Sequence, residues 1–451
     1  MIPKRTTIFA ALLAALAAFV PHGGARTAIA ACAFNTAQPT TYETTQDRRQ
    51  YMTAMDLAGY NMLFSGDNFF SQLSIGTGTR ANRSNSSDVF VPPTLLKAIS
   101  WIESSSTNGA PSVPFGSVGP VLVSFDCGYG ISQVTSGMTT PLGENGEPTD
   151  EQALVGTHFA YNIGRGAAIL IDKWNAAPSN RPIAGIDTNS DPRVMENWYY
   201  AVWSYNGFTG PGANRSNHPL DPVYPAWPRT PYSCGNAGDG LGHNRSLYPY
   251  QELVYGCAAH PPSVLGAPLW TPAPVTLPDL NNPYWRRPLS LTNFRYPYSA
   301  MDIPTPKPQH TDPTPPPSLL GRLYVVGLPQ LSVGQNIVLV NVRPGQSSTP
   351  ATVRISNAGT GIVPWKATVN KSWVTVSAQA GVAIGAELTC NPGSPCDRSA
   401  TLTISVDPRA IQGSDCAVLH IQGLGGAWNN QDVAIFVRTN VALGIPGTSK
   451  N

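Results

Sequence analysis

The chain has 451 residues, of which 41% are hydrophobic and 12% are charged, and it carries 28 basic and 26 acidic side chains. The length favours two or three domains, and an aromatic content of 9% argues against a disordered chain. Because the charges nearly cancel, the composition provides no electrostatic basis for binding nucleic acid, so we expect no such partner.

The first residues are predicted to be a targeting segment. Lys4 and Arg5 precede an apolar run at residues 8–20, and residues 28–30 (AIA) supply the small side chains of a cleavage site. The run is too short to span a bilayer, and no later stretch is long and apolar enough to do so. We therefore predict a secretory signal peptide at residues 1–31, no transmembrane helix, and a protein that is secreted or held in the cell envelope. Its removal takes away three basic residues and no acidic one, so 25 basic and 26 acidic side chains remain.

Seven cysteines in an exported chain favour disulfides. Their spacings fit no zinc pattern, so we expect neither a metal nor a cofactor. Cys234 with Cys257 is one expected pair, and the turn-rich stretch from Cys390 to Cys396 is expected to close on itself. The sequence does not prove this connectivity. An alternative concerns Cys32, which ends a stretch similar to a lipoprotein cleavage box and would then carry a lipid anchor.

Residues 32–302 are predicted to form a mainly helical domain with a Pro-rich extension at its end. The 42 Gly and 44 Pro residues of the chain favour long irregular loops between the helices. Apolar residues recur at spacings of three and four, which indicates amphipathic helices. The expected helices are Thr45–Leu63, Pro93–Ser104, Thr149–Ala176, Pro192–Tyr205 and Tyr250–Ala259.

Residues 303–318 contain 7 prolines in 16 residues and are predicted to form an extended, exposed linker. At about 3.1 Å per residue the linker would reach roughly 50 Å and keep its neighbours apart. We therefore expect the part of the chain before it to fold and act without the rest. Residues 319–451 contain short β-rich runs separated by turn residues, which predicts a small β-sandwich.

Glu103 is the first candidate for chemistry. Pro92 and Pro93 suit the first turn of a helix, which places Glu103 in its last turn beside Trp101 and Ile102. The negative end of the helix dipole and the apolar neighbours both favour the protonated carboxyl group and raise its pKa. A general acid that works near neutral pH needs such a pKa. The plainer alternative is a solvated glutamate at a helix end.

Further short motifs follow Glu103 in a fixed order. Together they resemble the soluble lytic transglycosylases, a lysozyme-like family, over roughly residues 88–210. The motifs are Glu103-Ser104, Gly130-Ile131-Ser132-Gln133, Asn162-Ile163 and Ser204-Tyr205-Asn206-Gly207. Ser132 departs from the family, which has Met at this place. The long segment between the first two motifs resembles an enlarged loop along the substrate cleft, so the sequence does not determine the glycan subsites.

The resemblance implies an α-rich lysozyme-like catalytic domain that cleaves the β-1,4 bond between N-acetylmuramic acid and N-acetylglucosamine in peptidoglycan. It implies that Glu103 protonates the leaving oxygen and then takes a proton from the C6 hydroxyl of the sugar, which leaves a 1,6-anhydro end. Tyr205 would hydrogen-bond to Glu103 and orient it. The residues implied in binding the sugar are Ser104, Ser132, Gln133, Asn162 and Asn206. We expect a monomer whose partner is the glycan strand.

The C-terminal part is similar to bacterial immunoglobulin-like modules of the BACON type. The similarity rests on Ser356-Asn357, Trp365, Trp373 and Gly381. It implies an all-β immunoglobulin-like sandwich that acts as a spacer or in adhesion, with both tryptophans in its core. The alternative is that the tryptophans form an exposed sugar-binding face.

The sequence thus predicts a multidomain protein, in which an α-rich lysozyme-like domain precedes an all-β sandwich. Two other functions stay open. A muramidase would hydrolyse the same bond, with Asp126 as a second carboxylate. A non-catalytic protein would only bind the cell wall, although the complete motif set argues against it.

Overall fold

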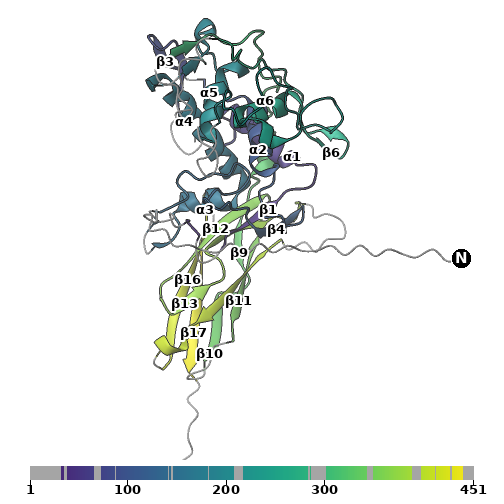
Figure 1. Cartoon of the computed structure of the whole chain (residues 1–451). Coiled ribbons are helices and arrows are strands. Elements are labelled where there is room, and N and C mark those ends of the chain that lie inside the picture. Colours follow the sequence, from purple (N-terminus) through teal and green to yellow (C-terminus); the bar gives the residue numbers. More distant parts are fainter. Residues whose placement is uncertain are drawn as a thin grey trace, which may run out of the picture.

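The computed structural model of the chain is shown in Figure 1. Its helices lie in one region, which we call the first region, and its longest strands in another. The residues that it describes are 32–34, 38–64, 73–86, 88–140, 142–143, 146–180, 182–207, 217–282, 285, 301–342, 349–388, 398–411, 413–426 and 429–439.

The helices of the described residues begin and end close to apolar periodic stretches. Most of them are short, and α4 is the longest. They are α1 Arg49–Gly59, α2 Pro93–Ser104, α3 Asp150–Thr157, α4 Phe159–Asn180, α5 Tyr199–Tyr205, α6 Tyr250–Ala259 and α8 Leu320–Val325.

Two predicted helices, α2 and α6, are confirmed at both ends. The predicted helix Thr149–Ala176 is wrong in one respect, because it is two helices with a break at His158. The backbone of His158 is extended, and its ring nitrogen Nδ1 accepts a hydrogen bond from the Ala160 N–H at 3.1 Å. The buried imidazole therefore caps the start of α4, where a Ser or Asp would be usual.

The predicted fold class is wrong, because the chain is a mixed structure with 26% helix and 26% strand rather than an α-rich domain joined to an all-β one. Two-stranded sheets lie among the helices of the first region. Apolar periodicity detected the helices but not these sheets, whose strands have only two to four residues. The sheets pair β1 Thr40–Glu43 with β4 Ser117–Pro120, β2 Ile75–Gly78 with β3 Arg83–Ser86, β5 Pro182–Ala184 with β8 Met301–Ile303, and β6 Ser263–Val264 with β7 Ala267–Pro268.

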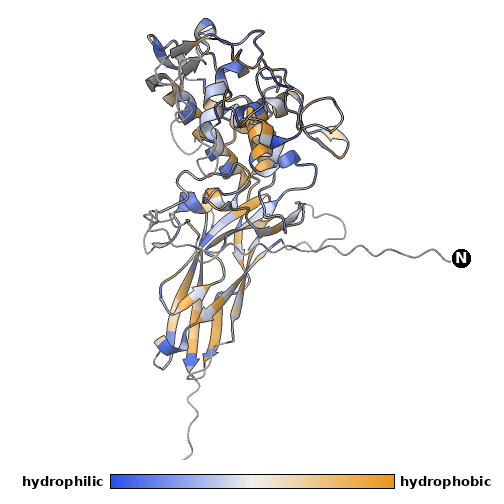
Figure 2. Cartoon of the chain, viewed as in Figure 1, coloured by the Kyte–Doolittle hydropathy of each residue, from blue (hydrophilic) through white to orange (hydrophobic). Residues whose placement is uncertain are grey.

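The strands of the C-terminal part form two sheets that enclose a separate hydrophobic core. Buried and exposed residues alternate along β10 and β11, as expected for sheets with one solvated face. Figure 2 shows that hydrophobic residues are frequent along the strands of this part. One sheet has the order β10 Ile337–Val342, β17 Gln431–Thr439, β16 Asp415–Gly423, β12 Ile362–Val369 and β14 Ala380–Ile384, and the other β13 Val374–Val376, β15 Ala400–Val406, β11 Ala351–Asn357 and β9 Leu331–Val333.

The two predicted core tryptophans of this sandwich are confirmed as buried. Trp365 is fully enclosed and Trp373 is 7% exposed. Gly381 lies against the Trp365 ring and the Thr40 hydroxyl, so an added Cβ would lie only 2.3 Å from that hydroxyl oxygen. This glycine therefore permits the first region and the sandwich to approach each other closely.

The sandwich packs directly on the first region. Val382 and Ile384 of β14 belong to the same hydrophobic core as helices α1 and α2. The Tyr161 hydroxyl of α4 donates a hydrogen bond to the Gly425 carbonyl at 3.2 Å, and Lys366 of β12 forms an ion pair with Asp150 of α3. The prediction that the two parts are held apart is therefore wrong.

The Pro-rich segment 303–318 does not run free in solvent. Its Thr305 hydroxyl donates to Asn197 at 2.7 Å, and its His310 ring is bonded to the buried Glu196 at 2.7 Å. The Tyr60 hydroxyl donates to the Thr314 carbonyl at 2.7 Å. Proline fixes the extended backbone, and the polar residues between the prolines fasten it to the first region.

Asp312 of this segment supports the start of helix α2. The residue before the helix, Pro92, has no side-chain acceptor for the free N–H groups of the first turn. Asp312 replaces it, because its carboxylate accepts from the Thr94 N–H at 2.8 Å and from the Thr94 hydroxyl at 3.1 Å. We expect Asp312→Ala to lower the free energy of unfolding by about 1–2 kcal/mol, the cost of losing a helix cap. Chemical denaturation would measure this loss, and Asp312→Asn, which keeps one acceptor oxygen, should lose less.

Two disulfides join described cysteines. The predicted Cys234–Cys257 bond is confirmed. Cys32 bonds to Cys127, so its sulfur is occupied and the alternative of a lipid anchor there is wrong in this structure. Cys390 and Cys396 lie outside the described residues, and Cys416 is a free, exposed thiol.

Disulfides are typical of exported proteins. Within the described ranges, no helix is both long and apolar enough to cross a membrane.

Candidate active site

The end of helix α2 fixes the position of Glu103. Ser105 and Ser106 both adopt the left-handed conformation, with φ of 55° and 51°, and turn the chain sharply after the helix. The Ser106 hydroxyl is bonded to Ser100 at 2.8 Å, and its carbonyl accepts from the Arg48 guanidinium at 3.1 Å. Ser104 donates to the Ile131 carbonyl at 2.8 Å and so joins the helix end to the second motif. The backbone around Glu103 is therefore held from several sides.

Glu103 is half-buried and bonds to a tyrosine from another part of the chain. The Tyr250 hydroxyl, at the start of α6, donates to Glu103 Oε1 at 2.5 Å. Arg245, which lies shortly before α6, donates to the Ile102 carbonyl at 2.5 Å and attracts the Glu103 carboxylate. Helices α2 and α6 pack side by side, so the acid and its donor come from neighbouring helices.

Burial raises the pKa of Glu103 from its usual 4.5 to about 7. The Tyr250 hydrogen bond and the positive charge of Arg245 oppose this rise, and the negative charge of Asp126 adds to it. A carboxyl group with this pKa is present in both protonation states near neutral pH. It can therefore donate a proton and take one back in the same reaction cycle.

Tyr205 does not bond to Glu103 as predicted. Its hydroxyl donates to the Ser132 carbonyl at 2.9 Å instead. Burial raises the pKa of Tyr205, and the charge of the nearby Glu103 raises it further. The structure thus places Tyr205 near the acid, but Tyr250 rather than Tyr205 donates the hydrogen bond to Glu103.

Asn162 has a structural position rather than one that faces a ligand. Its side chain is fully buried, accepts from the Ser132 N–H at 2.8 Å, and donates to the carbonyls of Tyr129 at 2.8 Å and Val155 at 3.0 Å. The bonds to Ser132 and Tyr129 fasten the second motif and the residue before it to helix α4, and the bond to Val155 joins α4 to α3. The prediction that Asn162 binds sugar is therefore replaced by a role in shaping the loop below Glu103.

The other predicted sugar-binding residues differ in how much of their side chain is exposed to a ligand. Gln133 is half-buried, with φ of 46°, and its amide donates back to the Gly130 carbonyl at 2.8 Å. Asn206 is exposed, and its Oδ1 accepts from Asn217 at 3.1 Å. Ser132 is buried, and its N–H and carbonyl are engaged by Asn162 and Tyr205. Gln133 and Asn206 keep exposed surface for a ligand, as does Ser104, whose hydroxyl already donates to Ile131.

Asp126 lies in a tight turn after Ser124. The Ser124 hydroxyl donates to Asp126 at 2.5 Å, and the Ser124 N–H donates to the Gly128 carbonyl at 2.9 Å. The carboxylate is exposed, and the neighbouring Cys127 disulfide holds the turn in place. Asp126 acts on Glu103 through its charge, with no hydrogen bond recorded between them among the described residues.

Sequence reasoning missed Tyr250 and Arg245, because no motif contains them. Tyr250 was predicted only as the first residue of a helix. The expected Cys234–Cys257 disulfide was one available indication, since it fastens α6 into the domain. In the described parts of the chain, no cluster of three or more His, Cys, Asp or Glu residues could hold a metal ion.

The Tyr250 hydrogen bond has a testable effect on pH dependence. The bond stabilises the charged carboxylate, so Tyr250→Phe should raise the pKa of Glu103 above about 7. The alkaline limb of the pH–activity profile should then move to higher pH, and the maximal rate should fall about 10- to 100-fold because the acid is less well oriented. The measurement is the rate of cell-wall clearing between pH 4 and 10. Tyr205→Phe is the control, and its profile should move little; a Tyr250→Phe profile that matches the wild type would contradict the assignment.

Comparisons with known proteins give only partial likenesses. No family model matches the chain, and no curated protein matches its sequence. Among solved structures, a Bacteroides ovatus GH5 xyloglucanase in complex with a XXXG heptasaccharide is 14% identical over 24% of this chain and 19% of that chain, with a TM-score of 0.18. The E. coli chaperone DraB is 14% identical over 25% of this chain and 55% of its own, with a TM-score of 0.19. WR4, a C. elegans MSP family member, is 11% identical over 24% of this chain and 97% of its own, with a TM-score of 0.17.

The chain thus spans about a fifth of the xyloglucanase and about half of the chaperone. Likenesses of this extent assign the chain to no family, and the function has to be argued from the site around Glu103.

Proposed function

We propose that the protein is a peptidoglycan lytic transglycosylase of the cell envelope, with Glu103 as its general acid and base. The observation that supports this most is the pKa of about 7 of Glu103, in a half-buried position with a tyrosine hydroxyl on one carboxylate oxygen. The resemblance of the sequence motifs around Glu103 to soluble lytic transglycosylases supplies the substrate class.

The proposed reaction uses one carboxyl group twice. Protonated Glu103 donates its proton to the oxygen of the β-1,4 bond as the bond to C1 of N-acetylmuramic acid breaks. The resulting carboxylate accepts the proton of the C6 hydroxyl, whose oxygen forms the new bond to C1. The proton count returns to its starting value, and no water is consumed.

The neighbours of Glu103 fit these two steps. Tyr250 holds the carboxylate in one orientation, and Arg245 stabilises its charged form between the steps. Ser104 bonds the second motif to the end of α2 and Asn162 bonds it to α4, which fixes the loop that carries Gln133. We assign substrate contact to Gln133 and Asn206, and positioning to the other residues.

A muramidase remains the second candidate, because the charge of Asp126 reaches Glu103. An exposed carboxylate in that place would serve as the base or nucleophile of a hydrolase with two carboxyl groups. Its hydrogen bond from Ser124 and its place in a tight turn favour the transglycosylase.

Mass spectrometry of digested peptidoglycan distinguishes the two reactions. We expect muropeptides with 1,6-anhydro ends, about 18 Da lighter than hydrolysed ends because no water is added. Asp126→Asn should still form these products. The loss of its charge lowers the pKa of Glu103, so the alkaline limb of the rate profile should move to lower pH. Reducing ends as the sole product, together with loss of activity in Asp126→Asn, would favour the muramidase.

A further inference from the structure

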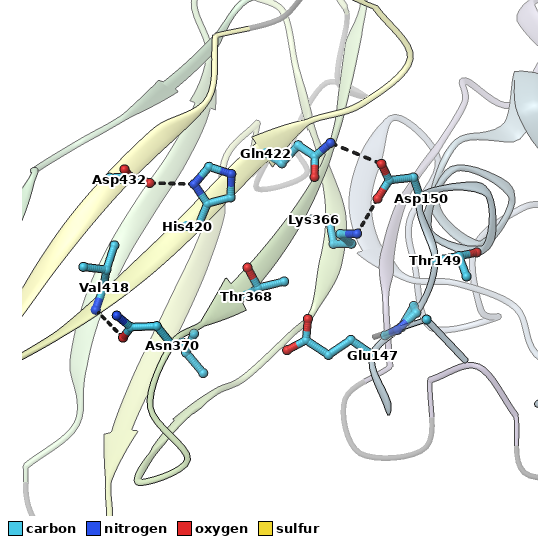
Figure 3. A pocket seen from close by; sticks show the side chains of 13 residues that line it. Glu147, Thr149, Asp150, Lys366, Thr368, Asn370, Val418, His420, Gln422 and Asp432 are labelled. Atoms are coloured by element: carbon cyan, nitrogen blue, oxygen red, sulfur yellow. Dashed lines mark hydrogen bonds and ion pairs between the residues drawn. The ribbon is translucent and has the colours of Figure 1, made fainter. Parts of the chain in front are cut away.

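A groove of about 770 Å³ lies where the first region meets the outer face of the sandwich. Figure 3 shows it from close by. One wall is the chain that leads into helix α3, and the other is formed by outward side chains of strands β12, β16 and β17. The groove is separate from Glu103, which does not line it. Because strands of the sandwich form one wall, a ligand in this groove would contact the sandwich as well as the first region.

Bonds across the junction hold the walls of the groove. The Thr149 side chain accepts from the Gln152 N–H and fixes the start of α3 in a capping box. Asp150, the first residue of α3, forms an ion pair with Lys366 and accepts from the Gln422 amide at 3.2 Å. Because Lys366 and Gln422 belong to β12 and β16, the groove is a built feature of the domain junction.

A second contact between a base and an acid lies further along the groove. His420 Nδ1 is 2.6 Å from Asp432 Oδ1, between the neighbouring strands β16 and β17. These contacts pair the Lys366 and His420 side chains with acids of the groove itself. Each base of the groove is therefore already in direct contact with an acid of the groove.

Glu147 is the acid that has no such pair. It is half-buried and lines the groove, and among the described residues no hydrogen bond or ion pair engages its carboxylate. Figure 3 shows its side chain reaching from the α3 wall toward Thr368 of β12. Lys366 attracts it from a distance, and burial raises its pKa. Three carboxyl groups line the groove together with one lysine and one histidine, so its acids outnumber its bases.

Neutral hydrogen-bonding groups lie next to Glu147. Thr368 of β12 presents a hydroxyl group, and Asn370 follows directly after the end of this strand. The Asn370 Oδ1 accepts from the Val418 N–H at 2.8 Å, which directs the amide group and leaves its nitrogen as a donor. Together with the carboxylate of Glu147, these hydrogen-bonding groups are complementary to a peptide that carries a positive charge.

We propose that this groove binds a peptide through a primary ammonium group, which pairs with Glu147, while peptide amides bond to Thr368 and Asn370. The proposal of an ammonium site is argued from the groove residues only and does not depend on the proposed function. The source of the peptide rests on the proposed function, since amine-bearing peptide stems of peptidoglycan would be the ligand, and the sandwich would then keep the enzyme on its substrate between cuts.

Isothermal titration with a blocked tripeptide, Ac-Ala-Lys-Ala-NH2, tests the ammonium site on the full chain. We expect the lysine peptide to bind at least about 10-fold more tightly than the same peptide with its side-chain amine acetylated. Glu147→Gln should remove this preference. Glu151→Gln is the matched control, because Glu151 is an exposed acid on the first turn of α3 outside the groove, and it should keep the preference. Equal affinity for both peptides, no binding at millimolar concentration, or an unchanged preference in Glu147→Gln would each overturn the proposal.

A second arm separates this inference from the proposed function. Glu103→Gln, which is expected to stop the cutting of peptidoglycan, should bind the lysine peptide with wild-type affinity. If the wild-type enzyme cuts peptidoglycan but shows no preference for the free amine, only the peptide-binding proposal is wrong. If the wild-type protein binds the lysine peptide but has no lytic activity, only the proposed function is wrong.

Discussion

Glu103→Gln is expected to lower lytic activity by at least about 100-fold, the lower end of what acid–base catalysis contributes. Glutamine keeps the shape of the side chain and can still accept from Tyr250, but it cannot give and recover a proton. The thermal unfolding temperature should stay close to that of the wild type. Clearing of cell walls and a melting curve of the same preparation measure both quantities.

Glu43→Gln provides a matched control for this experiment. Glu43 is also a buried carboxyl group whose pKa is raised to about 7 by burial. Its Oε2 accepts from the N–H groups of Asn108 and Gly109 at 2.7 Å each, so its role is to hold the turn after α2. We expect Glu43→Gln to lower the melting temperature and to keep the activity of each folded molecule. If Glu103→Gln clears cell walls like the wild type, the proposed function is wrong.

A chain that ends at Ala300 is expected to lose both cooperative folding and lytic activity. This is the opposite of what the Pro-rich linker predicted from the sequence. The truncation removes β8, which pairs with β5, and Asp312, which caps the helix of Glu103. It also removes apolar residues of the first region's core, among them Val325 and Val382.

The expected loss is large compared with the stability of a domain. Burial of one Val or Ile side chain contributes about 1.5–3 kcal/mol, and Ile303, Val325, Ile362, Val382 and Ile384 are all buried in that core. Their sum is comparable with a typical total stability of about 5–15 kcal/mol. Circular dichroism during heating should show no sharp transition for this chain.

A second truncation separates the linker from the sandwich. A chain that ends at Leu328 keeps the Pro-rich segment and α8, and it should regain part of the cooperative transition at a lower temperature than the full chain. A chain ending at Ala300 that unfolds cooperatively near the full-length melting temperature would show that the first region is independent.

Local sequence patterns were sufficient to predict features that depend only on neighbouring residues of the chain. The apolar spacing and the prolines at 92 and 93 predicted both ends of helix α2, and the same spacing predicted α6. The position of Glu103 in a last helical turn, among apolar neighbours, predicted the direction of its pKa shift. These features depend on residues within a few turns of one another, so the sequence alone was sufficient.

Only the tertiary structure decided the features that join distant segments. Tyr250 lies 147 residues from Glu103 and becomes its donor only because α6 packs against α2. The sequence motifs selected Tyr205 and Asn162, but only the fold shows that their side chains bond to the backbone of Ser132 in the second motif.

The Pro-rich segment shows the same limit. Its composition fixed an extended backbone, yet whether that backbone is solvated or bound depends on partners such as Thr94 and Glu196, more than a hundred residues away. Composition also could not reveal the short two-stranded sheets, whose strands are too brief for periodicity to detect. The sequence by itself therefore determined the helix that carries Glu103 and the apolar surroundings of its carboxyl group. The packing of distant segments decided which groups orient Glu103, which parts of the chain the folded site needs, and where the groove lies.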